Sequence, residues 1–310
     1  MGTIIFSHPN CIEHDTGNAH PESPARLKAV LSGLEDKEFW GLDRRDAELI
    51  DKKIIKLVHD SVFVESIFDR VPEKGRVYLD PDTSLSNGSG EASRRAAGAA
   101  IDAIDAVIAK KHQNAFCAIR PPGHHAESSQ AMGFCLFNSA AIAAYYARLV
   151  HGLKKIAIID FDVHHGNGTQ HSVEMDKDMF FGSSHQFPAY PGTGSNHETG
   201  CANNVINVQL TPGDGSTEFR NAYEKKIIPA LKLFGPELLI LSAGFDAHRA
   251  DPLAQLNLEI DDYEWVTSKL LAVANDCADG RVVSLLEGGY NLDALRLSAQ
   301  AHVRALMAFS

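Results

Sequence analysis

The sequence is poor in cysteine, and its few cysteines are scattered. The 310 residues include five, at Cys11, Cys117, Cys135, Cys201 and Cys277, and no CxxC pair occurs among them. This spacing indicates neither a disulfide scaffold nor a zinc ribbon. Cys117 and Cys135 lie in apolar runs and are interpreted as buried thiols, which favours a reducing compartment. We therefore expect a cytoplasmic protein.

Long hydrophobic runs and basic clusters are missing as well. No stretch approaches the roughly 20 apolar residues of a transmembrane helix. The first seven residues lack a basic segment and predict a strand, not a signal peptide. The lack of a long apolar stretch leads us to expect no membrane association. Because the formal net charge is −11 and no basic cluster occurs, we also expect no direct nucleic-acid binding. An acidic surface would instead attract cationic substrates.

The chain also lacks internal repeats, low-complexity tracts and linker-like segments, so we expect one domain over residues 1–310. Short apolar runs alternate with amphipathic stretches such as 97–108, 219–234 and 263–277. This alternation predicts an α/β fold, a single-domain three-layer sandwich whose mostly parallel central sheet is flanked by helices. The predicted strands are 4–7, 115–119, 156–160, 179–183, 205–208, 238–243 and 282–286.

Four predicted strands are followed by polar, glycine-rich segments. These are RPPGHHA at 120–126, DFDVHHGNG at 160–168, AGFDAH at 243–248 and EGGY at 287–290. Ligands of open α/β sheets bind outside the carboxyl ends of the strands. We therefore expect the four segments to converge on one site.

Asp162 and His164 stand two residues apart where a predicted strand ends, so their side chains should face the same way. Both could reach one metal ion, with Asp246 as third ligand, and three protein ligands plus water make a catalytic zinc site. Asp160 has the same parity and could orient a histidine. A lone Asp-x-His is more often a capped strand end, and it is the neighbouring polar loops that favour a metal. Fe(II) or Co(II) would also suit these ligands.

The tandem His124-His125 follows the stiff segment 121–123, Pro-Pro-Gly. The pKa of histidine suits general acid–base work near neutral pH, although a His-His pair alone could be an accident of composition. Tyr290, on a Gly-Gly turn, could donate a hydrogen bond to a developing oxyanion or could simply be a packed aromatic.

Together these segments resemble the histone deacetylase family, which has the arginase–deacetylase fold. The resemblance runs from HPESPAR at 20–26 to EGGY at 287–290, with the motifs in the family's order and spacing. Asn167 stands where class I members usually carry Asp, so the chain is closer to class II and bacterial class II-like members. The resemblance implies a zinc-dependent amidohydrolase that removes the acetyl group from N-ε-acetyl-lysine in proteins or peptides.

The resemblance also assigns the metal ligands. Asp162, His164 and Asp246 match the zinc ligands. A structural potassium site is implied as well, with oxygen ligands supplied by Asp160, Asp162, His164, Ser183 and Ser184, the backbone carbonyl serving in His164 and Ser184.

Proton transfer falls, by the same resemblance, to the tandem histidines. His125 matches the general base that deprotonates the attacking water and then protonates the leaving amine, and Asn167 is its partner. His124 matches the tandem partner, paired with Asp160, and Tyr290 matches the hydroxyl that polarises the amide carbonyl. Because Asn167 is neutral, it cannot raise the basicity of His125 as a carboxylate would, so we expect His125 to be neutral at working pH.

A narrow tunnel for the acyl-lysine stem is a further implication. Phe134 and Tyr190 match its aromatic walls, and Gly133 and Cys135 fit the same segment as Phe134. The family usually carries Phe at the second wall, so Tyr190 departs from the pattern.

The rim of the tunnel leaves the substrate open. Leu253 matches a rim position where class II lysine deacetylases usually carry Leu and acetylpolyamine amidohydrolases carry Glu, and either Asp80 or Asp82 could hold the substrate backbone. The alternatives are an acetylpolyamine amidohydrolase, or a lysine deacylase for longer chains. A two-manganese ureohydrolase would carry Asp where this chain has His248. A non-catalytic acetyl-lysine binding module would lack a base, ligand or tyrosine. The protein substrate and the oligomeric state stay open.

Overall fold

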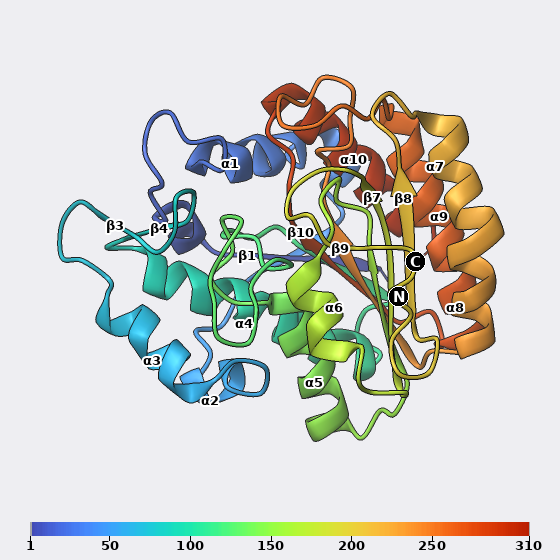
Figure 1. Cartoon of the computed structure of the whole chain (residues 1–310), viewed down its shortest axis with the longest axis horizontal. Helices are drawn as coiled ribbons and strands as arrows, with labels where there is room; N and C mark the ends of the chain where they lie inside the picture. The colour runs from blue at the N-terminus through green and yellow to red at the C-terminus, as the bar shows by residue number, and fades with distance from the viewer. Residues whose placement is uncertain (1, 310) are drawn as a thin grey trace.

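A parallel eight-stranded sheet forms the centre of the computed structural model, which describes residues 2–309 (Figure 1). Its strand order is β2-β1-β5-β10-β9-β6-β7-β8, and every neighbouring pair runs parallel. The strands are β1 Thr3–Ser7, β2 Asp43–Asp46, β5 Asn114–Cys117, β6 Ile156–Asp160, β7 Met179–Gln186, β8 Val205–Leu210, β9 Leu238–Ala243 and β10 Val282–Leu286. A separate antiparallel pair joins β3 Arg76–Tyr78 to β4 Ser84–Ser86.

Helices cover both faces of the sheet, as Figure 1 shows for α4 and α5 on one side and α7 to α9 on the other. The α-helices are α1 Pro24–Gly33, α2 Lys52–Ile55, α3 Ser61–Asp69, α4 Ser89–Ile108, α5 Ser139–His151, α6 Asn167–Val173, α7 Ser216–Ala222, α8 Ile228–Phe234, α9 Ile260–Cys277 and α10 Leu292–Ala308. Two 3-10 helices (η1 Pro9–Ile12, η2 Lys37–Phe39) and a π-helical turn (η3 Tyr223–Ile227) complete the helical elements of the described chain.

Alternating side chains of the strands pack into two separate hydrophobic cores, one on each face of the sheet. In β6, Ile156 and Ile158 pack with α4 and α5, whereas Ala157 and Ile159 pack with α9 and α10. This two-sided burial explains why the strands read as continuous apolar runs. The predicted three-layer α/β fold with a parallel sheet is thereby confirmed.

All seven predicted strands of the sheet are present, with ends shifted by up to three residues. The sequence pattern missed β2, because its four residues, Asp-Arg-Arg-Asp, are charged and exposed. Charged residues are a usual feature of edge strands, and this strand pairs with β1 alone. The predicted helix 219–234 is observed as α7 and α8 joined by the π-helical turn η3.

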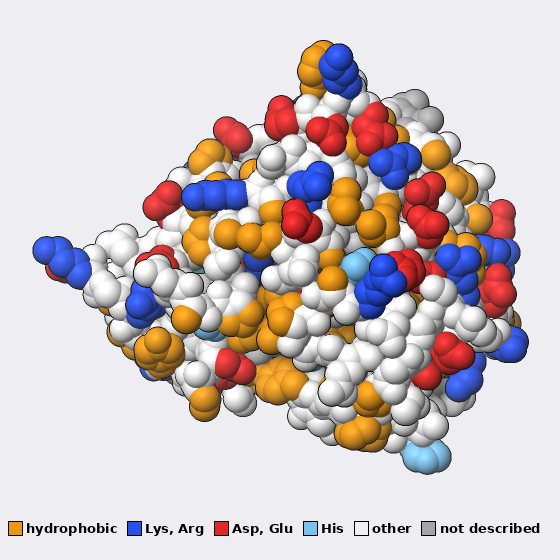
Figure 2. Space-filling model, turned by 90° about the horizontal axis from the view of Figure 1, so that it is seen from above, with side chains coloured by type: hydrophobic (Ala, Val, Ile, Leu, Met, Phe, Trp, Pro, Cys, Tyr) orange, Lys and Arg blue, Asp and Glu red, His pale blue; other side chains and the backbone are white. Residues whose placement is uncertain are grey.

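The strands that precede the four polar segments are immediate neighbours. They are β5, β10, β9 and β6, the middle of the sheet, so their carboxyl ends meet at one edge. The expected convergence of the four segments is therefore confirmed. On the face seen in Figure 2, acidic and basic side chains are interspersed. Within residues 2–309, no helix is both long enough and apolar enough to cross a membrane.

Candidate active site

A cavity of about 230 Å³ lies where the four polar segments meet. Seven of the residues predicted for the site line it, together with the rim candidate Asp82. The lining residues are Asp82, His125, Gly133, Phe134, His164, Tyr190, Leu253 and Tyr290. The structure therefore gathers histidines, aromatic walls and an apolar rim residue around one small space.

The three predicted metal ligands cluster at the floor of this cavity. One ligand atom each from Asp162, His164 and Asp246 lies within 4.8 Å of the other two. His164 Nδ1 is 3.1 Å from Asp162 Oδ1 and 3.2 Å from Asp246 Oδ2. Two carboxylates and one imidazole, with room for a further ligand in the adjoining cavity, fit a catalytic zinc site.

The parity argument for Asp162 and His164 was wrong in its premise, because β6 ends at Asp160. The two ligands lie in the loop beyond the strand, so strand alternation does not orient them. Backbone hydrogen bonds hold the two aspartate ligands instead: Gly288 N donates to Asp162 Oδ2 at 2.8 Å, and Val163 N donates to Asp246 Oδ1 at 2.8 Å.

Electrostatics at the floor favour a bound cation. Asp162 and Asp246 are buried, and burying unbalanced carboxylates is costly. Burial, together with the charge of Asp162, raises the pKa of Asp246 to about 7. Burial opposes a charge on His164, but hydrogen bonds to both carboxylates outweigh it and raise its pKa to about 10. Without a metal, a proton on His164 thus compensates the carboxylates.

His124 is held in its charged form. Its Nδ1 lies 2.9 Å from Asp160 Oδ2, as predicted, and both residues are buried. Burial opposes the charge, but the carboxylates of Asp162 and Asp160 outweigh burial and hold the pKa of His124 well above its usual value. This histidine is therefore a poor base at neutral pH.

His125, one residue later, is held neutral. Its Nδ1 lies 2.8 Å from Asn167 Oδ1, the predicted pairing. Burial and then the positive charges of His124 and His164 hold the pKa of His125 well below its usual value. The expectation of a neutral His125 therefore agrees with its surroundings, and the two adjacent histidines have opposite electrostatic roles.

Tyr290 faces the cavity from the β10 end, and a single carboxylate anchors its backbone. Asp251 Oδ2 accepts a hydrogen bond from Tyr290 N at 2.7 Å, and Asp251 Oδ1 accepts one from Leu253 N at 3.0 Å. Burial holds the pKa of Tyr290 well above its usual value, so its hydroxyl stays protonated and can donate. Sequence reasoning missed Asp251, although it lies between the proposed ligand Asp246 and the rim residue Leu253.

The two predicted aromatic walls line the cavity. Tyr190 packs edge-on against His125 at 5.1 Å between ring centroids, and Phe134 packs edge-on against Tyr290 at 5.8 Å. Gly133 has a φ of +55°, and a Cβ there would collide with the His125 ring, so glycine is required at this position. Cys135 is fully buried and is not among the residues that line the cavity.

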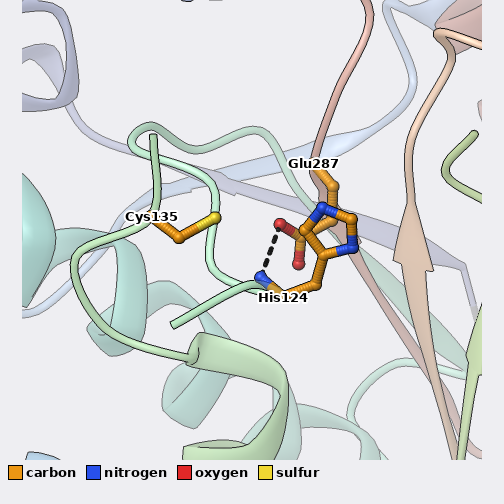
Figure 3. Close-up of side chains that lie close together, drawn as sticks. All are labelled: His124, Cys135 and Glu287. Atoms are coloured by element: carbon orange, nitrogen blue, oxygen red, sulfur yellow. Dashed lines mark hydrogen bonds between the residues drawn. The ribbon is translucent and has the colours of Figure 1, made fainter. Parts of the chain in front are cut away.

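A second cluster contains His124, Cys135 and Glu287, whose side chains come together in Figure 3. Glu287 Oε2 accepts hydrogen bonds from Gly123 N at 2.6 Å and from His124 N at 3.2 Å. This buried carboxylate thus fixes the backbone that carries both histidines, and burial raises its pKa to about 7. Its role was not predicted, although the EGGY motif that contains it was recognised.

Arg26 is another buried residue that sequence reasoning passed over. Its Nε donates to Gly289 O at 2.6 Å, and its guanidinium lies 4.9 Å from the centre of the Tyr290 ring. It belongs to the HPESPAR segment at 20–26, which was matched as a motif without a role for each member. Arg26 therefore packs the turn that presents Tyr290.

Two of the residues predicted to hold potassium come from neighbouring strands. Asp160 and Ser183 are register partners on β6 and β7, so the two residues are close. The Ser183 hydroxyl bonds to His185 Nδ1 at 2.9 Å, and the Ser184 hydroxyl donates to Tyr223 Oη at 3.3 Å.

The structure distinguishes the two rim aspartates. Asp80 Oδ1 accepts hydrogen bonds from Asp82 N at 3.0 Å and Thr83 N at 2.6 Å, so it caps its own turn. Asp82 lines the cavity, and burial raises its pKa. Asp82 is therefore the carboxylate that a substrate would meet.

Known proteins are similar to this chain over most of its length. The family model described as histone deacetylase domain matches residues 20–306. Histone deacetylase 14, chloroplastic, of Arabidopsis thaliana is 37% identical over 324 residues, covering 98% of this chain and 76% of its own. A histone deacetylase-like amidohydrolase of Pseudomonas aeruginosa is 38% identical over 277 residues, covering 87% of this chain and 72% of its own.

A third relative and a solved structure extend the comparison. A probable deacetylase of Archaeoglobus fulgidus is 35% identical over 302 residues, covering 94% of this chain and 82% of its own. The crystal structure of the HDA15 HD domain superposes with a TM-score of 0.93 at 34% identity, covering 99% of this chain and 88% of that one.

Proposed function

The chain belongs to the histone deacetylase family of deacetylases and amidohydrolases, and we propose that it hydrolyses the acetyl amide of N-ε-acetyl-lysine in peptides or proteins, using zinc. The observation that carries the proposal is the floor of the cavity. There a ligand trio, a neutral histidine and a protonated tyrosine surround one space. Amide hydrolysis needs these three functions: an electrophile, a base and an oxyanion donor.

Asp162, His164 and Asp246 would hold the zinc ion. When bound, zinc supplies a Lewis acid for the amide carbonyl and promotes ionisation of water. The donor set favours one metal over the two of a ureohydrolase, because His248 Nδ1 accepts a hydrogen bond from Ala250 N at 3.1 Å within its own loop.

Proton transfer is assigned to His125. With Nδ1 bonded to Asn167, its Nε2 is free to accept a proton from the attacking water and to return it to the leaving amine. His124 Nδ1 is bonded to Asp160, and the neighbouring carboxylates raise the pKa of His124, so its assigned role is to support the negative transition state and not to act as base.

Tyr290 would donate to the oxyanion that develops on the carbonyl oxygen. Phe134 and Tyr190 would enclose the alkyl stem of the lysine, because both rings line the cavity. The rest of the proposal comprises a single catalytic domain over the whole chain and potassium at the site that includes Asp160 and Ser183.

Leu253 supports a peptide substrate over a polyamine. It is 41% exposed and apolar, so the rim position that it occupies offers no charge to a second ammonium group. The alternative, an acetylpolyamine amidohydrolase, is favoured by Asp82, whose carboxylate lines the cavity and could pair with such a group. A deacylase for longer chains would use the same floor.

A substrate panel tests the proposal. The purified, zinc-loaded enzyme is assayed on acetyl-lysine peptides, peptides with longer acyl groups, and acetylpolyamines. The expected result is the highest kcat/KM on acetyl-lysine peptides. A higher kcat/KM on acetylpolyamines would overturn the lysine assignment while leaving the hydrolytic mechanism in place, and no turnover on any of them would overturn the proposal.

A further inference from the structure

The amide nitrogen of Asn167 is surrounded by hydrogen-bond acceptors. Nδ2 donates a hydrogen bond to Glu127 Oε1 and another, at 3.3 Å, to the backbone carbonyl of His125. An ionised carboxylate and a carbonyl accept hydrogen bonds and cannot donate them. The NH₂ end of the Asn167 side chain must therefore face Glu127, and the Oδ1 end must face His125.

This orientation decides which nitrogen of His125 carries the proton. Asn167 Oδ1 lies 2.8 Å from His125 Nδ1, and an amide oxygen accepts but cannot donate, so Nδ1 is the protonated nitrogen. In a neutral imidazole the other nitrogen, Nε2, then has the free lone pair. A base for an attacking water needs that tautomer.

An asparagine cannot guarantee this tautomer alone. Its two ends are nearly equal in shape, so a flipped Asn167 would donate from Nδ2 to His125 Nδ1 and place the proton on Nε2. An aspartate at 167 would leave no such ambiguity, because both its oxygens accept. In this chain a flip would instead press Oδ1 of Asn167 against the carboxylate of Glu127, with two acceptors in contact.

Glu127 is itself held in place independently of Asn167. Its backbone N donates to Gln130 O at 2.9 Å, and its backbone O bonds to His59 Nδ1 at 2.8 Å. On the outer side, His171 Nδ1 lies 2.9 and 2.8 Å from the two carboxylate oxygens. The Glu127 side chain is 21% exposed and that of His171 is 48% exposed. The connected side chains of His125, Asn167, Glu127 and His171 therefore run from the cavity to the surface.

We propose that Glu127 is a positioning residue, which fixes the amide orientation of Asn167 and thereby the Nδ1–H tautomer of His125. It touches neither the ligand trio nor the cavity. The inference deepens the proposed function and rests on it, because it assumes that His125 is the base. A carboxylate one step further out thus does the orienting that a carboxylate at 167 would do directly.

The tautomer can be measured without turnover. Zinc-loaded protein with ¹⁵N-labelled histidine is examined by long-range ¹H–¹⁵N NMR, and His125 is assigned by its loss in His125→Ala. The wild type is expected to show protonated Nδ1 and unprotonated Nε2. Glu127→Ala should show a substantial fraction of the opposite tautomer. Unchanged nitrogen shifts of His125 in Glu127→Ala would overturn the inference.

Kinetics supply a second readout. Glu127→Ala should lower kcat about 10–100-fold, by analogy with the outer partners of metal ligands, with little change in KM. Glu127→Gln can turn either its carbonyl or its NH₂ toward Asn167, so it should lose part of the tautomer preference and have a kcat between those of the wild type and Glu127→Ala. His171→Ala is the matched comparison: it removes a neighbour of the same carboxylate but leaves the Glu127–Asn167 contact, so it should lower kcat much less than Glu127→Ala does. A Glu127→Ala variant with wild-type kcat would contradict the inference.

Exchanging the carboxylate and the amide between positions 127 and 167 tests the inference directly. Asn167→Asp alone puts two carboxylates in contact and should lower kcat. When Glu127→Gln is added, the amide introduced at position 127 can donate to the new carboxylate, which in turn accepts from His125 Nδ1. The double variant should therefore exceed Asn167→Asp in kcat, and the Nδ1–H tautomer should return. Failure of both recoveries would count against the inference. A wild type inactive on every acyl substrate would overturn the proposed function instead, and the NMR result would still decide the tautomer.

Discussion

The floor and the rim of the cavity are built from different kinds of side chain. At the floor, Asp162 and Asp246 are at most 1% exposed, and His124 and His125 are 3% exposed. At the rim, Tyr190 and Leu253 are each 41% exposed. The floor contains charges and paired histidines, whereas these two rim residues are an aromatic and an aliphatic side chain.

This difference separates the residues expected to carry out the reaction from the residues expected to select the substrate. Electrostatic interactions between buried groups are weakly screened, so a change at the floor alters charge where the reaction occurs. A charge placed at the rim is exposed to water and salt, so an ion pair there contributes only on the order of 1 kcal/mol. Variants at the floor should therefore change kcat strongly, and variants at the rim should change the choice between substrates modestly.

The largest effect is expected from loss of the metal ligands. Asp246→Ala removes one of three ligands and should lose zinc and turnover, and a strong chelator should abolish turnover in the native enzyme, whereas a hydroxamate should inhibit it by occupying the metal. Zinc content by elemental analysis and a peptide assay measure this. Asp261→Ala, at an exposed position in α9, is the control and should keep both. Full activity in metal-free protein would contradict the assignment of a catalytic metal to Asp162, His164 and Asp246.

The next largest effect is expected from His125, and it can be compared with the effect of its neighbour His124. His125→Ala should lower kcat on the order of 10²–10⁴-fold, the range for a general base, with a much smaller change in hydroxamate affinity. His124→Ala should cost less, because its charge assists but does not transfer the proton. Parallel kcat, KM and inhibitor titrations decide between them. An equal or larger loss in His124→Ala would reverse the assignment of base and partner.

Removal of the Tyr290 hydroxyl is expected to have the third-largest effect on kcat. Tyr290→Phe keeps the ring that packs against Phe134 but removes one oxyanion donor, which costs on the order of 10²–10³ in kcat at comparable sites. Phe134→Tyr, a hydroxyl addition on the opposite ring, is the control and should have a smaller effect. Near-normal turnover in Tyr290→Phe would exclude the hydroxyl from the reaction.

The smallest effect is expected at the rim. Leu253→Glu should shift the ratio of kcat/KM for acetylpolyamine over acetyl-lysine peptide toward the polyamine by about tenfold, if the new ion pair contributes about 1.4 kcal/mol. The gain should shrink as salt rises. Leu253→Gln, similar in size but uncharged, should give a much smaller shift. An unchanged ratio in Leu253→Glu would mean that Leu253 merely packs its loop.

Much of the fold was predictable because its strands are buried on both faces. Runs such as Ile156–Asp160 are continuous in hydrophobicity, and that pattern survives in the sequence. The edge strand Asp43–Asp46 was not predictable, because it has no apolar side chain and depends on pairing with β1. The π-helical turn at Tyr223–Ile227 likewise leaves the apolar repeat unchanged.

The sequence by itself determined which chemistry the chain could bring to the site: the ligand types, the tandem histidines, the tyrosine and the polar loops that follow buried strands. Only the tertiary structure decided how those groups are held. Glu127, Asp251 and Glu287 act through hydrogen bonds to residues that are 40, 39 and 164 positions away. A carboxylate has no sequence signature for such a partner, because its function depends on the direction of one hydrogen bond, and that direction exists only after the sheet has brought the loops together.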